Sequence, residues 1–306
     1  MTSPTQLARL PFEQLPASLT DELTAAGLDA REVYDAVTRA VAEDLPGDDV
    51  TSWSTIPPDQ VETADFVARG NGTVAGLGVA ELVFRYVLGE VGVGRPVADG
   101  TAVLRGDVLL TVTGPTALLL TAERTALNFA CHLSGVATAT RGWVEVLSAG
   151  HTRVRDTRKT VPGLRHLEKY AVRAGGGVNH RTDLSEMALV KDNHVLAAGG
   201  VVPAWELVRA AYPDVPVQVE VTTLDQLREL LAVGVEEILL DNMDDARMAE
   251  AVRITGGRAR LEASGGLTLG RAAEVAATGV DFIAVGALTH SAPVLDIAMD
   301  LRPASS

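Results

Sequence analysis

The sequence has a single cysteine, few aromatic residues and no long uninterrupted apolar run. Because one thiol, Cys131, cannot form an intrachain disulfide, we expect the protein to work in a reducing cytoplasm. The apolar stretches at 74–89 and 115–133 are each interrupted by two charged residues, so neither is expected to cross a membrane. The start of the chain lacks the apolar core of a signal peptide, and none is expected.

Broad positive charge is also missing, since the formal net charge is -14 and the pI is about 4.8. Nucleic acid and anionic membranes are therefore not expected as partners, because both require an extensive basic surface. Aromatic residues make up only 4% of a chain that is 47% hydrophobic, so the core must consist mainly of Val, Leu, Ala and Ile. That composition favours α/β packing, and 306 residues suffice for one large core and a smaller second domain.

One segment, residues 151–191, has the opposite charge from the rest of the chain. It contains nine Lys or Arg residues and four acidic ones, so it is +5 while the remainder is -19. A run of charges is most often a solvated helical face. Here, however, basic residues lie beside turn residues, and charged residues recur further along the chain at the spacing of βα units. We therefore expect a local site for an anion.

The first half of the sequence predicts an α+β layer domain over residues 1–126. Its expected elements are a helix at 29–45 capped by Asp29, strands at 61–70 and 101–113, and a helix at 78–89 lying on them.

Two further segments flank these elements. Residues 1–27 mix Pro, Thr and Gln and are expected to form a loosely held arm. Pro115 suits the start of a long Ala/Leu helix that reaches about residue 148, is loosened at Gly135 and bridges two domains.

The second half has a different rhythm, in which short apolar runs end in a polar or small residue and a helical segment follows. The runs are 152–157, 188–193, 217–221, 237–242, 259–266 and 281–287. Each interval has room for one helix and two loops, which indicates successive βα units with parallel strands. Six such units favour a closed or nearly closed barrel over an open sheet, although the spacing alone allows either.

Charged and small residues gather where these strands end, which is where barrel enzymes build their active sites. The residues are Arg158, Lys159, Lys191, Asp192, Glu220, Asp241, Asn242, Ser264, Gly265, Gly266 and Gly286. A single charged strand end is as often an ion pair that closes the core, but five ends around one mouth indicate a site.

Each group suits a particular ligand. The glycine turns at 264–266 and 285–287 let backbone N–H groups approach a phosphate. Glu220 and Asp241 suit Mg²⁺, sugar hydroxyls or a developing positive charge on a sugar carbon. The basic residues around 158–159, 181 and 191 suit carboxylate and diphosphate groups. Taken together, these groups predict phosphoribosyl transfer to an acidic acceptor.

Other chemistry is less favoured by the residues. The histidines and Cys131 lack the spacing of zinc ligands, and Cys131 in an apolar helix suggests packing. A class I aldolase-like barrel would use Lys191 or Lys159 as a Schiff base. A non-catalytic phosphosugar-binding regulator would be expected to lack one of the two strand-end carboxylates, and both are present.

Several motifs in order resemble one family. They are EDLPGDDVTS, ERTALNFACHLSGVAT, DTRKTVPGLRHLEKYAVRAGGGVNHR, LVKDNH, VEV, LDNM, LEASGGL and VGALTHS. They cover the chain from about residue 28, resemble quinolinate phosphoribosyltransferase, and leave the arm before residue 28 as an apparent addition. The resemblance implies an α/β fold with an incomplete, seven-stranded parallel barrel of the type II phosphoribosyltransferases and an N-terminal α+β sandwich domain. The expected domains are 1–126, 127–290, and a segment at 291–306 that returns to the first.

The resemblance also implies a reaction, in which quinolinate and 5-phosphoribosyl-1-diphosphate give nicotinate mononucleotide, diphosphate and CO₂ in NAD biosynthesis, with Mg²⁺ and no organic cofactor. It implies a cytoplasmic homodimer in which Arg124 reaches the neighbouring site. Lys159, Lys191, Glu220 and Asp241 would be catalytic, and Glu220 and Asp241 would face the ribose and the metal. The implied substrate-binding residues are Arg124, Thr157, Arg158, Lys159, His180, Arg181, Lys191, Glu220, Asp241, Ser264, Gly265, Gly266, Val285, Gly286, Ala287 and His290. A paralogous phosphoribosyltransferase with another acceptor is the alternative.

Overall fold

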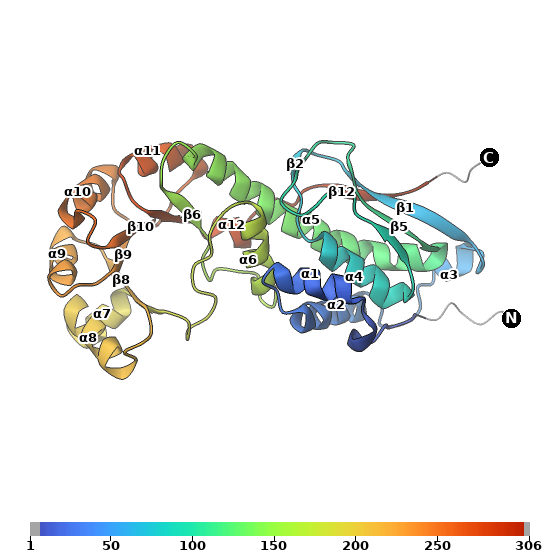
Figure 1. The fold of residues 1–306 in the computed structure, drawn as a ribbon, viewed down its shortest axis with the longest axis horizontal. Coiled ribbons are helices and arrows are strands. Elements are labelled where there is room, and N and C mark those ends of the chain that lie inside the picture. The colour runs from blue at the N-terminus through green and yellow to red at the C-terminus, as the bar shows by residue number, and fades with distance from the viewer. Residues whose placement is uncertain (1–6, 303–306) are drawn as a thin grey trace. The chain divides into compact units, whose positions relative to one another are not determined.

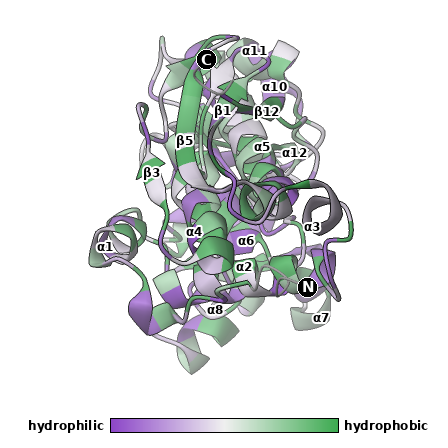
Figure 2. Cartoon of the chain, turned by 90° about the vertical axis from the view of Figure 1, so that its right-hand side faces the viewer, coloured by the Kyte–Doolittle hydropathy of each residue, from purple (hydrophilic) through white to green (hydrophobic). Residues whose placement is uncertain are grey.

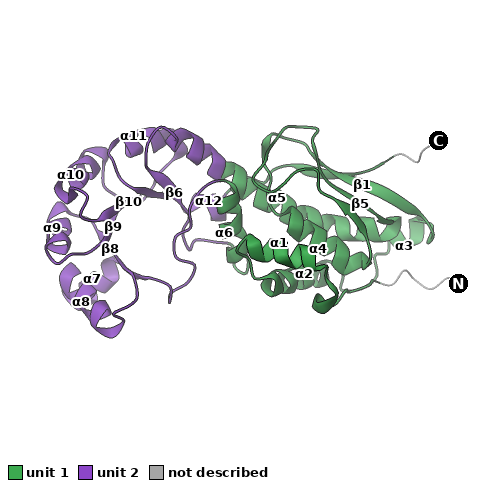
Figure 3. Cartoon of the chain, in the orientation of Figure 1, with its two compact units in different colours: residues 1–139, 161–175, 292–306 green, residues 140–160, 176–291 purple. Residues whose placement is uncertain are grey.

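The computed structural model describes residues 7–302, which divide into two compact units (Figures 1 and 3). Unit 1 takes residues 1–139, 161–175 and 292–306, and unit 2 takes 140–160 and 176–291. The sequence suggested domain boundaries at 126/127 and 290/291. In the structure, the first boundary between the two units along the chain is at 139/140. That boundary falls inside one continuous helix, so no turn or change of composition marks it. No helix among residues 7–302 is both long and apolar enough to cross a membrane.

Unit 1 contains a small antiparallel sheet and the helices that pack on it. Its elements are η1 (Phe12–Gln14), α1 (Ala17–Ala25), α2 (Ala30–Asp44), α3 (Ser52–Thr55), β1 (Val61–Ala68), β2 (Gly72–Thr73), α4 (Leu77–Leu88), β3 (Gly92–Gly94), β4 (Ala102–Val103), β5 (Val108–Pro115), most of α5 (Thr116–Leu147), α6 (Arg165–Ala174) and β12 (Ile297–Leu301). The predicted helix with Asp29 as its cap is α2, and the Asp29 carboxylate accepts from the N–H groups of Arg31 and Glu32.

The core of unit 1 lies between the sheet and α4. The strands run in the order β12-β1-β5-β3, and β5 is coloured mainly as hydrophobic in Figure 2. On β1, Ala64, Phe66 and Ala68 are buried in alternation with more exposed residues. The Phe66 ring meets Phe84 of α4 edge to face, with ring centroids 5.6 Å apart. This face therefore stabilises the unit through apolar burial. The predicted strand at 101–113 is divided, because a turn at 104–107 separates β4 from β5.

The prediction of a loosely held N-terminal arm was wrong for the part that the structure describes, from residue 7. The backbone N–H groups of Ala8 and Leu10 donate to carbonyls of α4 at 2.9 and 3.1 Å. Leu19 and Leu23 of α1 are buried. Two leucines four residues apart give this short helix an apolar stripe, which the presence of Pro and Thr nearby obscured. Residues 1–6 lie outside the described part.

Helix α5 runs without interruption through Gly135, so the predicted loosening there was wrong. A Cβ at this position would lie 2.3 Å from the carbonyl oxygen of Pro293 and 2.8 Å from the Cα of Val294. The glycine therefore allows a close approach of backbone to the helix, and it does not break the helix.

Unit 2 is built from βα units whose helices lie around the sheet in Figure 1. Its elements are β6 (Arg153–Arg155), β7 (Ala188–Val190), α7 (Asp192–Ala198), α8 (Val201–Ala211), β8 (Val217–Val221), α9 (Leu224–Ala232), β9 (Glu237–Asp241), α10 (Asp245–Thr255), β10 (Arg260–Ser264), η2 (Leu269–Arg271), α11 (Ala272–Ala277), β11 (Phe282–Ala284) and α12 (Ala287–His290). All six predicted strands are confirmed.

The six strands form one parallel sheet in the order β6-β11-β10-β9-β8-β7. Its register places apolar residues side by side, as in the row Val219, Ile238 and Leu261, which is buried throughout. The neighbouring row on the opposite face contains Glu220, Leu239 and Glu262. Because successive side chains of a strand point to opposite faces, the apolar rows pack against the helices and the mixed rows are directed to the other side.

The sheet continues beyond β6 through one residue. Val178 forms a parallel bridge with Arg155, outside the named strands. The preceding Gly-Gly-Gly run offers no side chains to pack, so only a single bridge forms here. Within residues 7–302 no pairing joins Val178 to β7, and the barrel is incomplete, as predicted.

Candidate active site

A cavity of about 680 Å³ lies at the carboxyl ends of the unit 2 strands, and all of its lining belongs to unit 2. The lining residues are Thr157, Arg158, Lys159, His180, Arg181, Leu189, Lys191, Asp192, Glu220, Leu239, Asp241, Asn242, Glu262, Ser264, Gly265, Gly266, Leu267, Ala284, Val285, Gly286, Ala287 and His290. Every residue that the sequence predicted for the substrate site is among them except Arg124. That arginine is exposed on α5, in unit 1.

Asp156 organises the basic end of the cavity. This carboxylate is fully buried and accepts hydrogen bonds from the Asn179 side chain at 2.5 Å and the His180 backbone N–H at 2.8 Å. It thus fastens the loop after β6, which carries Arg158 and Lys159, to the residues after the Val178 bridge. Two segments far apart in sequence are held together by one charge-assisted network.

Two arginines stand close together at this end. The pKa of Arg181 is lowered, first by burial and then by the neighbouring Arg158 guanidinium. Arg181 also donates to the carbonyl of Met187 at 2.7 Å, which fixes its side chain. Crowding of two cations at a partly buried position is unfavourable by itself and becomes favourable when an anion lies between them.

His180 is held at both ring nitrogens. Its Nδ1 accepts the backbone N–H of Arg181 at 2.7 Å, and its Nε2 lies 2.9 Å from the Gln218 carbonyl oxygen. Because Nδ1 accepts, the ring proton is on Nε2. The His180 ring therefore lies in the cavity wall in an orientation fixed by Gln218 of β8 and by the backbone of the next residue.

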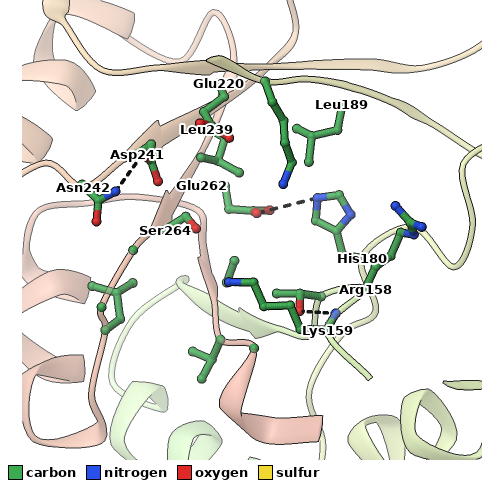
Figure 4. A pocket seen from close by; sticks show the side chains of 18 of the residues that line it. Arg158, Lys159, His180, Leu189, Glu220, Leu239, Asp241, Asn242, Glu262 and Ser264 are labelled. Atoms are coloured by element: carbon green, nitrogen blue, oxygen red, sulfur yellow. Dashed lines mark hydrogen bonds and ion pairs between the residues drawn. The ribbon is translucent and has the colours of Figure 1, made fainter. Parts of the chain in front are cut away.

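The carboxylates lie on neighbouring strands on the other side of the cavity (Figure 4). The pKa of Glu220 is raised, first by burial and then by the charge of Asp241, while Lys191 acts in the opposite direction. In the described part of the chain, no group of three or more His, Cys, Asp or Glu side chains is placed to hold a metal ion. Any divalent cation here would need ligands from a substrate in addition to these two carboxylates.

Two glycine turns complete the mouth of the cavity. Gly265 and Gly266 follow β10 with φ of +100° and +60°, a region that side chains disfavour. At Gly286 a Cβ would lie 2.9 Å from the Cδ of Lys159. The lysine backbone carbonyl also accepts from the Thr289 hydroxyl at 2.7 Å. Glycine at 286 therefore leaves the space in which the Lys159 side chain lies.

One residue of the cavity lining, Glu262, belongs to a charged pair that the sequence analysis missed. Glu262 is buried and accepts from Arg155 at 2.9 Å, and the Arg155 guanidinium stacks on the Phe282 ring, 3.6 Å from its centroid. Glu262 also lies 3.7 Å from His180. The signal was present, because Glu262 stands two residues before Ser264 and therefore shares its face of β10.

An incomplete α/β barrel with cations and paired carboxylates around one cavity at the strand ends is the architecture of a barrel enzyme whose site suits anionic ligands. Residues 49–134 match the family model of the quinolinate phosphoribosyl transferase N-terminal domain, and residues 136–300 match that of its C-terminal domain. The chain belongs to the quinolinate phosphoribosyl transferase family and is a pentosyltransferase.

Individual relatives agree with this placement. The nicotinate-nucleotide pyrophosphorylase (carboxylating) of Mycobacterium leprae is 51% identical over 273 residues, which are 87% of this chain and 96% of that protein. The structure of NadC from Streptococcus pyogenes has a TM-score of 0.85 at 39% identity, covering 88% of this chain and 95% of that one. The nicotinate-nucleotide pyrophosphorylase from Francisella tularensis has a TM-score of 0.86 at 33% identity, covering 97% and 99%. Most of residues 1–27 thus have counterparts there and are not an addition relative to that structure.

Proposed function

We propose that the protein transfers the phosphoribosyl group of 5-phosphoribosyl-1-diphosphate to quinolinate. The products are nicotinate mononucleotide, diphosphate and CO₂, and the reaction belongs to the de novo biosynthesis of NAD. We place it in the cytoplasm, because the sole cysteine leaves the fold independent of disulfides.

The main support for this proposal is that one cavity has a cationic end and an anionic end. At one end the pKa of Arg181 is lowered, first by burial and then by Arg158, and at the other the pKa of Glu220 is raised, first by burial and then by Asp241. Like charges are neighbours at each end, which favours a ligand group of the opposite charge. A reaction that joins a dianionic acceptor to a sugar carbon that becomes positive meets both needs at once.

The basic end suits a dicarboxylate better than a monocarboxylate. Arg158 and Arg181 each offer a planar fork for a carboxylate, and the His180 ring lies in the wall of the same cavity. In this proposal, the arginines orient the acceptor and take no part in proton transfer, since guanidinium groups stay charged. The pyridine nitrogen is thereby aimed at the ribose carbon, which supplies much of the rate through positioning.

The acidic end suits the ribose and the diphosphate leaving group. Glu220 and Asp241 would stabilise positive charge on the ribose carbon as its bond to the diphosphate oxygen breaks. The turns at 264–266 and 285–287 would hold the 5-phosphate through backbone N–H groups. Lys159 and Lys191 line the same cavity and would take up charge on the departing diphosphate.

The residues present fit Mg²⁺, because two carboxylate oxygens close enough to raise a pKa are the type of ligand that this ion shares with substrate phosphates. When bound, the ion would neutralise part of the diphosphate charge. The new bond between ring nitrogen and ribose makes the ring cationic. The bond to the adjacent carboxylate then breaks, its electron pair stays on the ring carbon, and a proton replaces the CO₂.

We further propose a homodimer in which Arg124 completes the neighbouring subunit's site. The support is that Arg124 is exposed on α5 and lines no part of the cavity of its own unit 2. A third guanidinium from a partner would add to the cationic end, where a dianion binds.

The function is tested with purified protein, quinolinate, the phosphoribosyl diphosphate and Mg²⁺. We expect equimolar nicotinate mononucleotide and CO₂, with nicotinate as the control acceptor. Conversion of nicotinate without release of CO₂ would instead assign the protein to the alternative acceptor.

The shared site is tested by mixing two inactive variants, Arg124→Ala and Lys159→Ala, under conditions of subunit exchange. In a mixed dimer one site has both defects and the other has neither. About a quarter of the wild-type activity should therefore return at equal mixing, since half of the dimers are mixed and each has one intact site. No recovery despite proven exchange would exclude the contribution of Arg124 across the dimer.

A further inference from the structure

Asn242, directly after β9, has an unusual backbone conformation. It has a φ of +51°, and only Arg9 shares a positive φ among the non-glycine residues that the structure describes. Asparagine tolerates this left-handed region better than most residues, but the conformation is still disfavoured and is often found at functional sites. The Asn242 backbone N–H donates to the Ser264 carbonyl at 3.0 Å, so the conformation is held by the next strand.

The side chain of Asn242 is directed at the carboxylate of its neighbour (Figure 4). Its amide nitrogen donates to Oδ2 of Asp241 at 2.7 Å. A carboxylate can only accept, so the nitrogen of the amide, and not its oxygen, faces Asp241. One carboxylate oxygen is thereby occupied, and the rotation of the Asp241 side chain is restricted.

The other end of the same amide lies against the glycine turn. A Cβ at Gly265 would lie 2.2 Å from the Asn242 carbonyl oxygen and 2.6 Å from its Cγ. It would also lie 3.1 Å from the Asn242 backbone nitrogen, which cannot move independently of β9. The Asn242 amide therefore fills the space between Asp241 and the turn at 264–266, and both of its neighbours line the cavity.

We propose that Asn242 is a positioning residue that sets the orientation of Asp241 relative to the 264–266 turn. The inference rests on the proposed function, in which Asp241 faces the ribose and the turn holds its phosphate. One amide thus fixes the spacing between the group that stabilises charge on the sugar and the group that binds the sugar's phosphate. Asn242 acts through Asp241 and takes no part in bond making.

Three substitutions separate the amide from the backbone conformation. Asn242→Gly keeps the left-handed conformation without the amide, Asn242→Asp keeps the shape but replaces the donor with a charge that repels Asp241, and Asn242→Ala removes both. We expect KM for the phosphoribosyl diphosphate to rise on the order of tenfold in all three, as for other residues that orient ligating carboxylates. KM for quinolinate should stay near the wild-type value. Recovery in Asn242→Gly would show that only the backbone matters and would overturn the proposal.

The decisive experiment is a double-mutant cycle with Asp241→Ala, which removes the acceptor of the Asn242 amide, and kcat/KM for the phosphoribosyl diphosphate is compared. If Asn242 acts through Asp241, adding Asn242→Ala to Asp241→Ala should change that value less than about twofold, because the interaction is already lost. Multiplicative effects of the two changes would refute the mechanism. Asn71→Ala is the matched control, since Asn71 belongs to unit 1 and accepts one loop N–H from Arg105.

Binding of ribose 5-phosphate, followed by calorimetry, gives a readout independent of turnover. We expect weaker binding by Asn242→Ala and unchanged binding by Asn71→Ala. Unchanged binding by both would count against the inference. Failure of the wild-type protein to form nicotinate mononucleotide would instead count against the proposed function, so the two failures can be told apart.

Discussion

The two units use the same rule of strand alternation for opposite purposes. On β1 of unit 1 the buried positions are Ala64, Phe66 and Ala68, and the Phe66 ring packs against Phe84 of α4. In unit 2 the apolar rows also pack against helices, but the alternate rows carry Glu220 and Glu262 on the other face. In a parallel sheet, one face is covered by the packed helices. The other face of an incomplete barrel can therefore carry charged side chains for a ligand.

The largest effect should come from the apolar core of unit 1. Phe66→Ala removes a fully buried ring and is expected to lower the free energy of unfolding by about 3–5 kcal/mol. Urea unfolding measures this loss, with the 64% exposed Leu104 changed to Ala as a control within about 0.5 kcal/mol of wild type. Unchanged stability together with lost activity in folded Phe66→Ala would contradict the assignment of this face to stability.

The reverse pattern is expected for the basic end of unit 2. If Arg158 binds a carboxylate of quinolinate as proposed, Arg158→Ala should reduce kcat/KM for quinolinate on the order of a hundredfold, because a charge-assisted hydrogen bond to the substrate is lost. Steady-state kinetics and urea unfolding of the same sample would show lost activity with little lost stability. Arg209→Ala, an exposed arginine of α8 outside the cavity, serves as the matched control. Wild-type kinetics for Arg158→Ala would refute its role.

A smaller effect is expected for Gly286→Ala. The added Cβ would lie 2.9 Å from Cδ of Lys159, so the lysine side chain must move. If Lys159 acts on the substrate as proposed, kcat/KM should fall about tenfold, because a displaced group loses much of its effect. Gly270→Ala adds the same methyl group in open space and should be neutral in the kinetic assay. Equal losses in both variants would show that glycine at 286 has no special relation to Lys159.

The smallest effect concerns ionisation at the acidic end. Because the pKa of Glu220 is raised, its charged form costs stability at neutral pH, and this cost is relieved as the pH falls through the folded-state pKa. Asp241→Asn removes the largest cause after burial, so the pKa of Glu220 should fall and the folded protein should gain slightly in stability at pH 7. An NMR titration of the Glu220 carboxyl group, together with thermal unfolding, checks both signs. A rise in that pKa would contradict the arrangement.

The regular parts of both units could be predicted because each has a local signal. Asp29 caps α2 as its sequence position indicates, and the six parallel strands follow from apolar runs at βα spacing. The bridge of Val178 with Arg155 could not be predicted, because it is a single residue after three glycines and has no strand pattern of its own. Gly135 was misread because the close approach of Pro293 is a tertiary contact with no local trace.

The gathering of the strand-end residues in one cavity could be predicted, whereas the residues further down the strands were not identified. The strand-end residues from Thr157 to His290 line one cavity, since parallel strands end on one side of a sheet. Glu262 and Arg155 were missed because charged residues inside strands are unexpected until the register shows that they pair. Asn242 stood at a predicted strand end, but its left-handed backbone and its contact with Gly265 are visible only in three dimensions.

The antiparallel pairing of β12 with β1 has a consequence for folding during translation. Residues 297–301 follow the whole of unit 2 in the chain, and until they are synthesised one edge of β1 presents unpaired backbone groups. The sheet of unit 1 therefore lacks β12 for as long as unit 2 is being synthesised. This interval is when a chaperone would have the most to protect, and a premature stop before residue 297 would make the exposure permanent.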